Sequence, residues 1–172
     1  MRINVREIIA GRRLKQETAE LDISDVVRHN PNVLSASGAT VVLDAWGEGK
    51  YAAVTGRITC DVELVCSRCL TAFRHPLEVP FEEYFELDRT DGDEETEDDD
   101  GRLVHAAKSD VIDLDPYLKE NIAVAVPAFP LCREDCRGLC PVCGADRNVK
   151  DCGCREEHTD PRWSALKDLL ES

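Results

Sequence analysis

Residues 51–87 decide the fold class, and they read YAAVTGRITCDVELVCSRCLTAFRHPLEVPFEEYFEL. Apolar side chains recur near every second position on both sides of the central CSRC, which is the periodicity of strands with one buried face. The main ones are Val54, Ile58, Val62, Leu64, Phe73, Leu77, Val79, Phe81, Phe85 and Leu87. We therefore predict a long antiparallel hairpin with Cys66 and Cys69 at its tip. Pro76 and Pro80 place the returning strand at a sheet edge or at a bulge.

The rest of the chain adds strands before this hairpin and helices after it. An alternation of apolar and polar residues predicts N-terminal strands that contain Ile3, Val5, Leu21 and Ile23. Residues 39–46 predict another strand. A helix is expected over Asp115–Val126, with Asp115 as N-cap and Pro116 at the first helical position. A second helix is expected over Asp160–Leu170.

Charge is distributed unevenly along the 172 residues, whose net charge is -14. Residues 91–130 carry 12 acidic and 3 basic residues, whereas residues 1–15 carry five basic residues and one acidic residue. The net charge therefore does not exclude a local nucleic-acid surface. Eight of the ten residues 91–100 are acidic, which predicts a disordered, solvated loop over about residues 88–102. The functional alternative for this loop is RNA mimicry or binding of a basic protein.

The nine cysteines suggest metal ligands because the chain is expected to be cytoplasmic. No segment approaches the roughly 20 apolar residues of a membrane span, and the N-terminus lacks the apolar region of a signal peptide. Cytoplasmic thiols stay reduced, so clustered pairs favour metal over disulfides. An odd number also leaves one cysteine over, and Cys60 is expected to be buried in an apolar strand.

Eight cysteines form four close pairs, which is the spacing of structural zinc sites. Two thiolates two to four residues apart can reach one ion, and four pairs supply two tetrahedral all-cysteine sites. The predicted ligands are Cys66, Cys69, Cys132, Cys136, Cys140, Cys143, Cys152 and Cys154. We expect two structural zinc ions and no catalytic residue.

Two pairings of these cysteines are possible. One joins pair 66/69 to pair 132/136 and pair 140/143 to pair 152/154. The other joins pair 66/69 to pair 140/143. Loop-closure entropy favours the first by about 0.7 kcal/mol, which does not decide between them. The turn residues Pro141, Gly144 and Gly153 also favour the first.

An enzymatic centre finds little support in the sequence. Catalytic zinc usually keeps an open position and has His or Glu ligands, whereas here cysteines come in complete fours. The four histidines show no HExxH spacing, and the P-loop, GxSxG and GxGxxG patterns are absent. A thiol-redox function remains the alternative, because CxxC is also an oxidoreductase motif.

These patterns together predict an α+β fold. It consists of an antiparallel β-rich body with a long hairpin, one or two short helices and a C-terminal cysteine zinc-knuckle segment. The body and first helix would span residues 1–130. The zinc-binding segment and C-terminal helix, residues 131–172, would pack on that body.

Five motifs resemble the YceD-like large ribosomal RNA subunit accumulation family of bacteria and plastids. They are Leu64-Val-Cys66-Ser-Arg-Cys69-Leu, Asp113-Leu-Asp115 with Glu120-Asn-Ile and Pro127, Cys136-Arg-Gly-Leu-Cys140-Pro-Val-Cys143-Gly, Asn148 with Cys152-Gly-Cys154, and Asp160-Pro-Arg-Trp-Ser-Ala-Leu. The resemblance covers about residues 55–170. It says little about the first 50 residues.

The resemblance implies a non-enzymatic factor required for 23S rRNA accumulation and ribosome biogenesis. The implied partners are large-subunit rRNA or its precursor, and a small large-subunit ribosomal protein. Some relatives lack the late CPxCG and CxC cluster, which makes the second zinc an optional brace. Candidate rRNA contacts are Arg68, Arg74, Arg137 and Arg147. The alternatives are a module that holds a basic ribosomal protein and, with less support, a thiol-redox protein.

Overall fold

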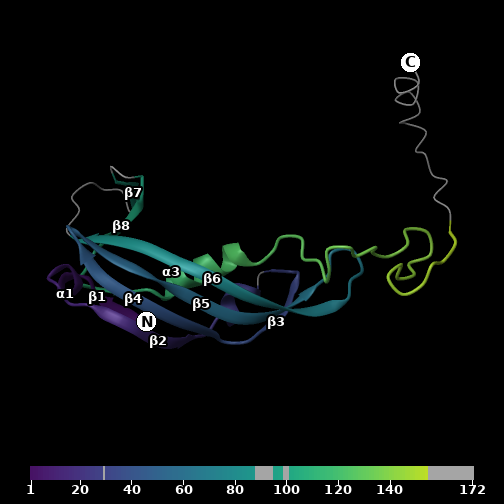
Figure 1. Ribbon diagram of the computed structural model, residues 1–172, viewed down its shortest axis with the longest axis horizontal. Coiled ribbons are helices and arrows are strands. Elements are labelled where there is room, and N and C mark those ends of the chain that lie inside the picture. Colours follow the sequence, from purple (N-terminus) through teal and green to yellow (C-terminus); the bar gives the residue numbers. More distant parts are fainter. Residues whose placement is uncertain (29, 88–94, 99–100, 155–172) are drawn as a thin grey trace, which may run out of the picture.

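The computed structural model describes residues 1–28, 30–87, 95–98 and 101–154. Its main sheet has the strand order β2-β4-β5-β6-β8-β7, with β3 also paired to β5, and β1 and β9 form a separate pair. Figure 1 shows an elongated molecule in which the cysteine-rich segment continues beyond one end of the sheet. The elements are β1 Arg2–Asn4, α1 Val5–Ile9, β2 Leu14–Leu21, α2 Ser24–Arg28, β3 Val33–Ala36, β4 Ala39–Glu48, β5 Tyr51–Val65, β6 Ala72–Leu87, β7 Glu95–Glu97, β8 Leu103–Ala107, β9 Val111–Asp113 and α3 Asp115–Ala125.

The predicted hairpin is the centre of this sheet. All 15 residues of β5 pair antiparallel with β6, from the pair Tyr51 and Glu86 to the pair Val65 and Ala72. On the other side of β6, the described strand β8 runs parallel to it and pairs only with residues 84–87. Pro76 and Pro80 therefore lie in the part of β6 that forms a sheet edge, as predicted from their missing N–H groups.

One face of the sheet carries the main core. Alternate residues of β4, β5 and β6 point to this face, where α1 and α3 cover them, and each fully buried large side chain contributes about 1.5–3 kcal/mol. The largest buried side chains include Phe81, Phe85, Ile8, Ile58, Leu64, Leu118 and Ile122. A smaller cluster of Ala53, Tyr84 and Val104 lies apart from this core. The fold is α+β with a mainly antiparallel sheet, as expected.

The N-terminal region differs from the sequence expectation because two short helices interrupt it. Val5 was expected in a strand but begins α1, where the side chain of Asn4 accepts a hydrogen bond from the amide of Glu7 at 3.0 Å. Ile23 was also expected in a strand but lies between β2 and α2, which begins at Ser24. Helices of five residues are too short to produce a recognisable apolar period.

Helix α3 confirms the expected helix after residue 114, with one correction at its start. Leu114 occupies the N-cap position and Asp115 is the first helical residue. The carboxylate of Asp113 accepts the hydrogen bond from the amide of Asp115 at 3.1 Å. The expected helix over Asp160–Leu170 lies outside the described residues. So does most of the acidic segment, although Glu95–Glu97 form β7 beside β8.

Candidate metal centres

The tip of the β5–β6 hairpin places two cysteines in a tight turn. The amide of Cys66 donates to the carbonyl of Thr71 at 3.0 Å, and the amide of Leu70 donates to the carbonyl of Cys66 at 2.9 Å. Leu70 adopts a left-handed conformation with φ of 59°, which completes the reversal. These bonds direct the sulfurs of Cys66 and Cys69 into one small volume.

Residues 130–139 dock directly on this tip. The amide of Ser67 donates to the carbonyl of Pro130 at 2.8 Å, and the amide of Leu139 donates to the carbonyl of Arg68 at 3.0 Å. The guanidinium of Arg68 donates in return to the carbonyl of Cys136 at 2.8 Å. Gly138 permits this approach, because its φ is +69° and a Cβ there would lie 2.9 Å from the Arg68 carbonyl.

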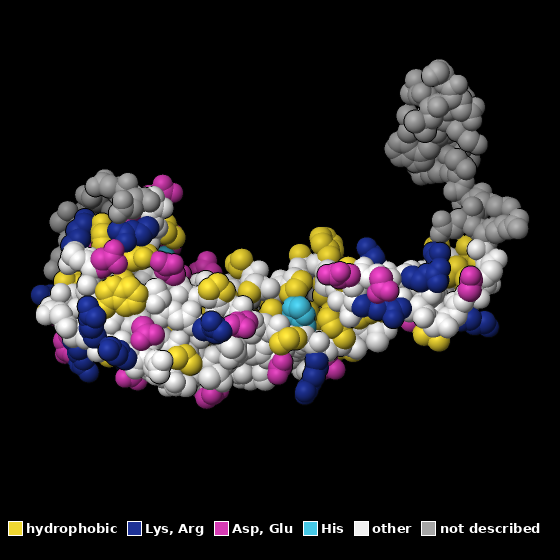
Figure 2. Space-filling view, viewed as in Figure 1, with side chains coloured by type: hydrophobic (Ala, Val, Ile, Leu, Met, Phe, Trp, Pro, Cys, Tyr) yellow, Lys and Arg dark blue, Asp and Glu magenta, His cyan; other side chains and the backbone are white. Residues whose placement is uncertain are grey.

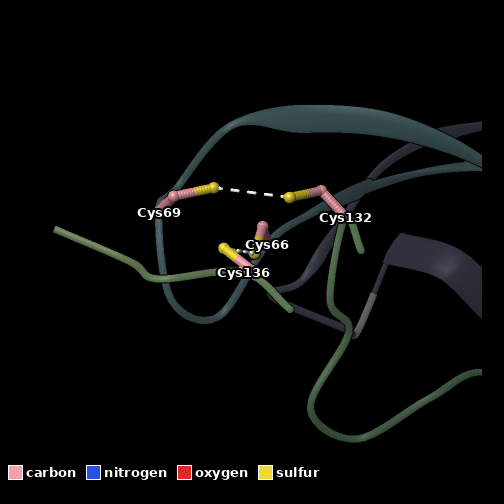
Figure 3. Close-up of side chains that lie close together, drawn as sticks. All are labelled: Cys66, Cys69, Cys132 and Cys136. Atoms are coloured by element: carbon pink, nitrogen blue, oxygen red, sulfur yellow. Dashed lines mark hydrogen bonds between the residues drawn. The ribbon is translucent and has the colours of Figure 1, made fainter. Parts of the chain in front are cut away.

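The docked segment brings four sulfurs together as the first tetrad, which comprises Cys66, Cys69, Cys132 and Cys136 (Figure 3). The Sγ atoms of Cys66 and Cys136 are 3.8 Å apart, and those of Cys69 and Cys132 are 3.6 Å apart. Four sulfurs at about 2.3 Å from one zinc ion form a tetrahedron with edges of about 3.8 Å. A disulfide would need about 2.05 Å. The donor set and its spacing therefore fit a shared metal ion.

The electrostatics of the first tetrad also favour a cation. Burial raises the pKa of the Cys66 thiol, but hydrogen bonds from the amides of Cys132, Cys69 and Arg68 lower this pKa to about 6. Burial and the adjacent thiols raise the pKa of Cys132 to about 12. Cys66 thus loses its proton readily, and its negative charge opposes the formation of a second thiolate at Cys132. A divalent ion would stabilise all four thiolates together.

The second tetrad comprises Cys140, Cys143, Cys152 and Cys154, and their sulfurs lie within 4.8 Å of one another. The amide of Cys140 donates to the carbonyl of Ala145, and the amide of Gly144 donates to the carbonyl of Cys140, both at 2.8 Å. Hydrogen bonds from the amides of Cys143 and Val142 lower the pKa of Cys140 to about 7. The neighbouring thiols of Cys143 and Cys152 raise the pKa of Cys154 to about 12. This tetrad can also hold a metal ion.

Asn148 lies between Cys143 and Cys152 in sequence but contacts the first tetrad, a role that sequence patterns did not reveal. Its side-chain amide donates to the sulfur of Cys136 at 3.4 Å. Its side-chain oxygen accepts from the amide of Arg137 and from the guanidinium of Arg133, each at 2.7 Å. A lone asparagine 12 residues from a cysteine matches no general spacing rule. Its only sequence signal is its place in the motifs that resemble the YceD-like family.

The two tetrads contain the eight cysteines expected as ligands and group them as in the first of the two pairings. Cys60 is buried in β5, as expected, and burial raises the pKa of its thiol. None of the helices in the described part of the chain combines the length and apolarity that a membrane span requires.

The four candidate arginines are exposed near the tetrads. Arg137 and Arg147 lie in the cysteine-rich segment, Arg68 lies at the hairpin tip, and Arg74 faces Glu63 in the β5–β6 register. Figure 2 shows lysine and arginine side chains at this end of the molecule, with acidic side chains among them. Arg68 already donates to the Cys136 carbonyl, so its guanidinium is partly engaged.

Comparison with known proteins places the chain in a family. The family model described as large ribosomal RNA subunit accumulation protein YceD matches residues 54–170. The chain belongs to the YceD family. This family is named for the accumulation of ribosomal RNA rather than for an enzymatic activity.

Relatives of this YceD-family chain occur in several bacteria and in a plant. An uncharacterized protein of Mycobacterium tuberculosis is 36% identical over 118 residues, which are 68% of this chain and 55% of that protein. The Bacillus subtilis protein YlbN is 31% identical over 156 residues, 90% of this chain and 86% of that protein. The chloroplastic YCED homolog 1 of Arabidopsis thaliana is 28% identical over 60 residues, 35% of this chain and 19% of that protein.

The YceD-family chain thus spans about half the length of the mycobacterial relatives that it matches. No solved structure matches it.

Proposed function

We propose that this protein is a non-enzymatic, cytoplasmic factor required for accumulation of large-subunit (23S) rRNA and for ribosome biogenesis. The observation that carries this proposal is the family match over residues 54–170, which includes both tetrads. The geometry agrees with a structural use of the cysteines, because each sulfur faces three others. A zinc ion bound by four thiolates has no open position for a substrate.

Zinc is the proposed metal in both tetrads. At the first tetrad, Cys66 and Cys69 come from the hairpin, whereas Cys132 and Cys136 come from a segment more than 60 residues later in the chain. The ion would therefore fasten the segment after α3 to the hairpin tip. At the second tetrad, the ion would give shape to residues 140–154, where Val142 and Val149 are exposed and supply no apolar core.

Direct contact with rRNA or its precursor would involve Arg74, Arg137 and Arg147, with Arg68 supporting the tip. The described residues 131–154 contain four basic and four acidic side chains, so attraction to RNA depends on how the arginines are arranged rather than on net charge. Phosphate contacts release counterions, so the affinity should fall steeply as the salt concentration rises.

The experiment that tests this contact is filter binding of large-subunit rRNA and its precursor over a range of salt concentrations. The double variant Arg137→Gln/Arg147→Gln should bind about tenfold more weakly and show a shallower salt dependence. Arg28→Gln/Lys50→Gln removes the same charge at exposed positions outside both the cysteine-rich segment and the basic first 15 residues, and should change the affinity less than twofold. Equal weakening by the two variants would contradict the proposed RNA surface.

Two alternatives follow from the same features. A thiol-redox role has weaker support. Each close cysteine pair lies beside a second pair, and the four sulfur atoms are spaced as they would be around one metal ion. A module that holds a basic large-subunit ribosomal protein has specific support from a groove beside α3.

A further inference from the structure

A groove runs along α3, and none of its described lining residues belongs to a tetrad. It consists of two adjoining cavities of about 370 and 390 Å³. Both cavities are lined by Glu95, His105 and Tyr117, so they meet at these three residues. The larger cavity also borders the edge of β6 at Val79, Pro80 and Glu83.

The lining of the larger cavity combines carboxylates with apolar surface. Among the described residues that line it, Glu83, Glu95 and Glu120 are charged apart from His105, and none is a lysine or arginine. The described lining of the smaller cavity adds Asp113 and the basic residue Lys108. The apolar walls of the larger cavity are Val79, Pro80, Leu103, Val124 and Ala125. Val124 is 82% exposed and Leu103 is 46% exposed, so the rim offers apolar contact to a partner.

Internal contacts fix the floor of the groove. His105 is buried, and its Nε2 lies 2.7 Å from a carboxylate oxygen of Glu83. The side-chain amide of Asn121 donates to the other oxygen of Glu83 at 3.1 Å. The Tyr117 ring packs edge-on against His105, with centroids 4.8 Å apart. Glu83 is thereby held in place. Glu95 is exposed, and one of its carboxylate oxygens lies 3.4 Å from Nδ1 of His105, whereas Glu120 is exposed on α3.

The edge of β6 restricts how a ligand could bind in this groove. Residues 76–83 of β6 precede the part that pairs with β8, so their outer edge is a possible site for an added strand. Pro76 and Pro80 lack N–H groups and interrupt the hydrogen bonds that such a strand needs. Recognition here would therefore depend on side chains entering the cavities.

We propose that this groove binds an extended, lysine- and arginine-rich segment of a partner protein. The long stems of these side chains would pack on the apolar walls, while their charged ends reach Glu95 and Glu120. Tyr117 provides an aromatic ring for a cation beside His105. RNA phosphates would be repelled by the same carboxylates. The inference rests on the proposed function in one respect, namely that ribosome assembly supplies such basic proteins.

The test uses the full chain loaded with zinc and a fluorescein-labelled decapeptide in which arginine alternates with serine. Fluorescence anisotropy at moderate salt measures the affinity. Glu95→Gln/Glu120→Gln should weaken binding about tenfold. Glu17→Gln/Glu134→Gln removes the same charge at exposed positions outside the groove lining and should weaken it less than twofold. If both double variants weakened peptide binding equally, the peptide would be attracted by net charge alone, and the proposal would be overturned.

A second pair of variants tests the groove without removing carboxylates. Val124→Arg places a cation at the rim and should abolish most of the binding. Val149→Arg makes the same change at a valine of similar exposure, 85%, in the cysteine-rich segment and should leave the binding unchanged. Circular dichroism confirms that both variants fold. If Val124→Arg binds the peptide like the parent, the groove is not the site.

Two further measurements distinguish a peptide site from RNA binding and from polyamine binding at the same groove. Glu95→Gln/Glu120→Gln should bind rRNA as the parent does, and a parallel loss of rRNA binding would contradict a separate peptide site. Spermine at equal charge should compete at least tenfold less well than the decapeptide. Equal competition would assign the groove to a small polyamine instead. Normal rRNA levels in a deletion strain would refute the proposed function but would leave the peptide result valid.

Discussion

The two tetrads each consist of four cysteines, but they occupy different positions in the fold. The first joins the hairpin tip to a segment 63 to 70 residues away, and Cys66, Cys69 and Cys136 are buried there. The second uses residues 140–154 alone, and Cys143 and Cys154 are exposed. Four cysteines can thus form either a cross-link between distant segments or a brace within one short segment.

The energetic consequences should differ accordingly. Cross-linking a long loop removes more entropy from the unfolded chain than cross-linking a short one. The first tetrad also lies against Phe73, Leu131 and Leu139, so its loss would expose packed apolar surface. The second tetrad has less packing to lose.

The largest expected effect follows from Cys66→Ser. Structural zinc contributes on the order of 10 kcal/mol, so loss of the first site should lower the thermal midpoint by roughly 20 °C or more. Differential scanning calorimetry measures this shift. Cys60→Ala changes a buried cysteine outside both tetrads and should lower the midpoint by only a few degrees. A Cys66→Ser midpoint equal to that of the parent would refute the cross-link.

Cys140→Ser should have a smaller and local effect, because the second tetrad does not join distant segments. We expect trypsin to cut faster at Arg147 and Lys150, while the tip at Arg68 stays as resistant as in the parent. Mass spectrometry of limited digests locates the cuts. In Cys66→Ser the cut at Arg68 should also accelerate. Faster cutting at Arg68 in Cys140→Ser would show that the tetrads form a single cooperative unit.

The next largest effect is expected on acidification, where the two tetrads should lose zinc at different pH values. Metal ligation needs thiolates, so protons displace zinc as the pH falls. Amide hydrogen bonds lower the pKa of Cys66 to about 6 and that of Cys140 to about 7, so the first tetrad should keep its thiolate to lower pH. A colorimetric zinc indicator should therefore record loss from the second tetrad first. In Cys140→Ser the release at higher pH should be absent, and its persistence would reverse the assignment.

The smallest expected effect concerns Asn148, whose side chain contacts the first tetrad. Asn148→Ala removes the N–H···S bond to Cys136 and two accepted hydrogen bonds, and should destabilise the protein by about 1–2 kcal/mol. Asn148→Asp keeps an acceptor oxygen but loses the donor to sulfur. Zinc transfer to a chelator should accelerate several-fold in both variants. Unchanged transfer in Asn148→Asp would show that the N–H···S bond does not stabilise the first tetrad.

The sequence predicted what local patterns encode. The hairpin follows from period-2 apolar residues between Tyr51 and Leu87, and the four cysteine pairs follow from their close spacing. How the pairs share ions was favoured, but not decided, by loop length and turn residues. The five-residue helices α1 and α2 were missed because they are shorter than the period that reveals a helix. Asp115 was expected at the N-cap of α3 but is the first helical residue. The carboxylate of Asp113, not that of Asp115, accepts a backbone amide hydrogen bond at the start of this helix.

The other omissions depend on tertiary structure. Asn148 contacts Cys136 only because the cysteine-rich segment folds back on itself. The groove beside α3 arises where β6, β8 and the helix meet, and no segment of sequence contains it. The parallel pairing of β6 with β8 is likewise a long-range contact. The proposed division into residues 1–130 and 131–172 stays a prediction.

Metal content per chain is the most direct test of the account, measured by elemental analysis after purification under reducing conditions. The account predicts two zinc ions in the parent and about one in each of Cys66→Ser and Cys140→Ser. Cys60→Ala should retain both ions. A parent without metal, or substitutions that leave its metal content unchanged, would contradict the assignment of the tetrads as zinc sites.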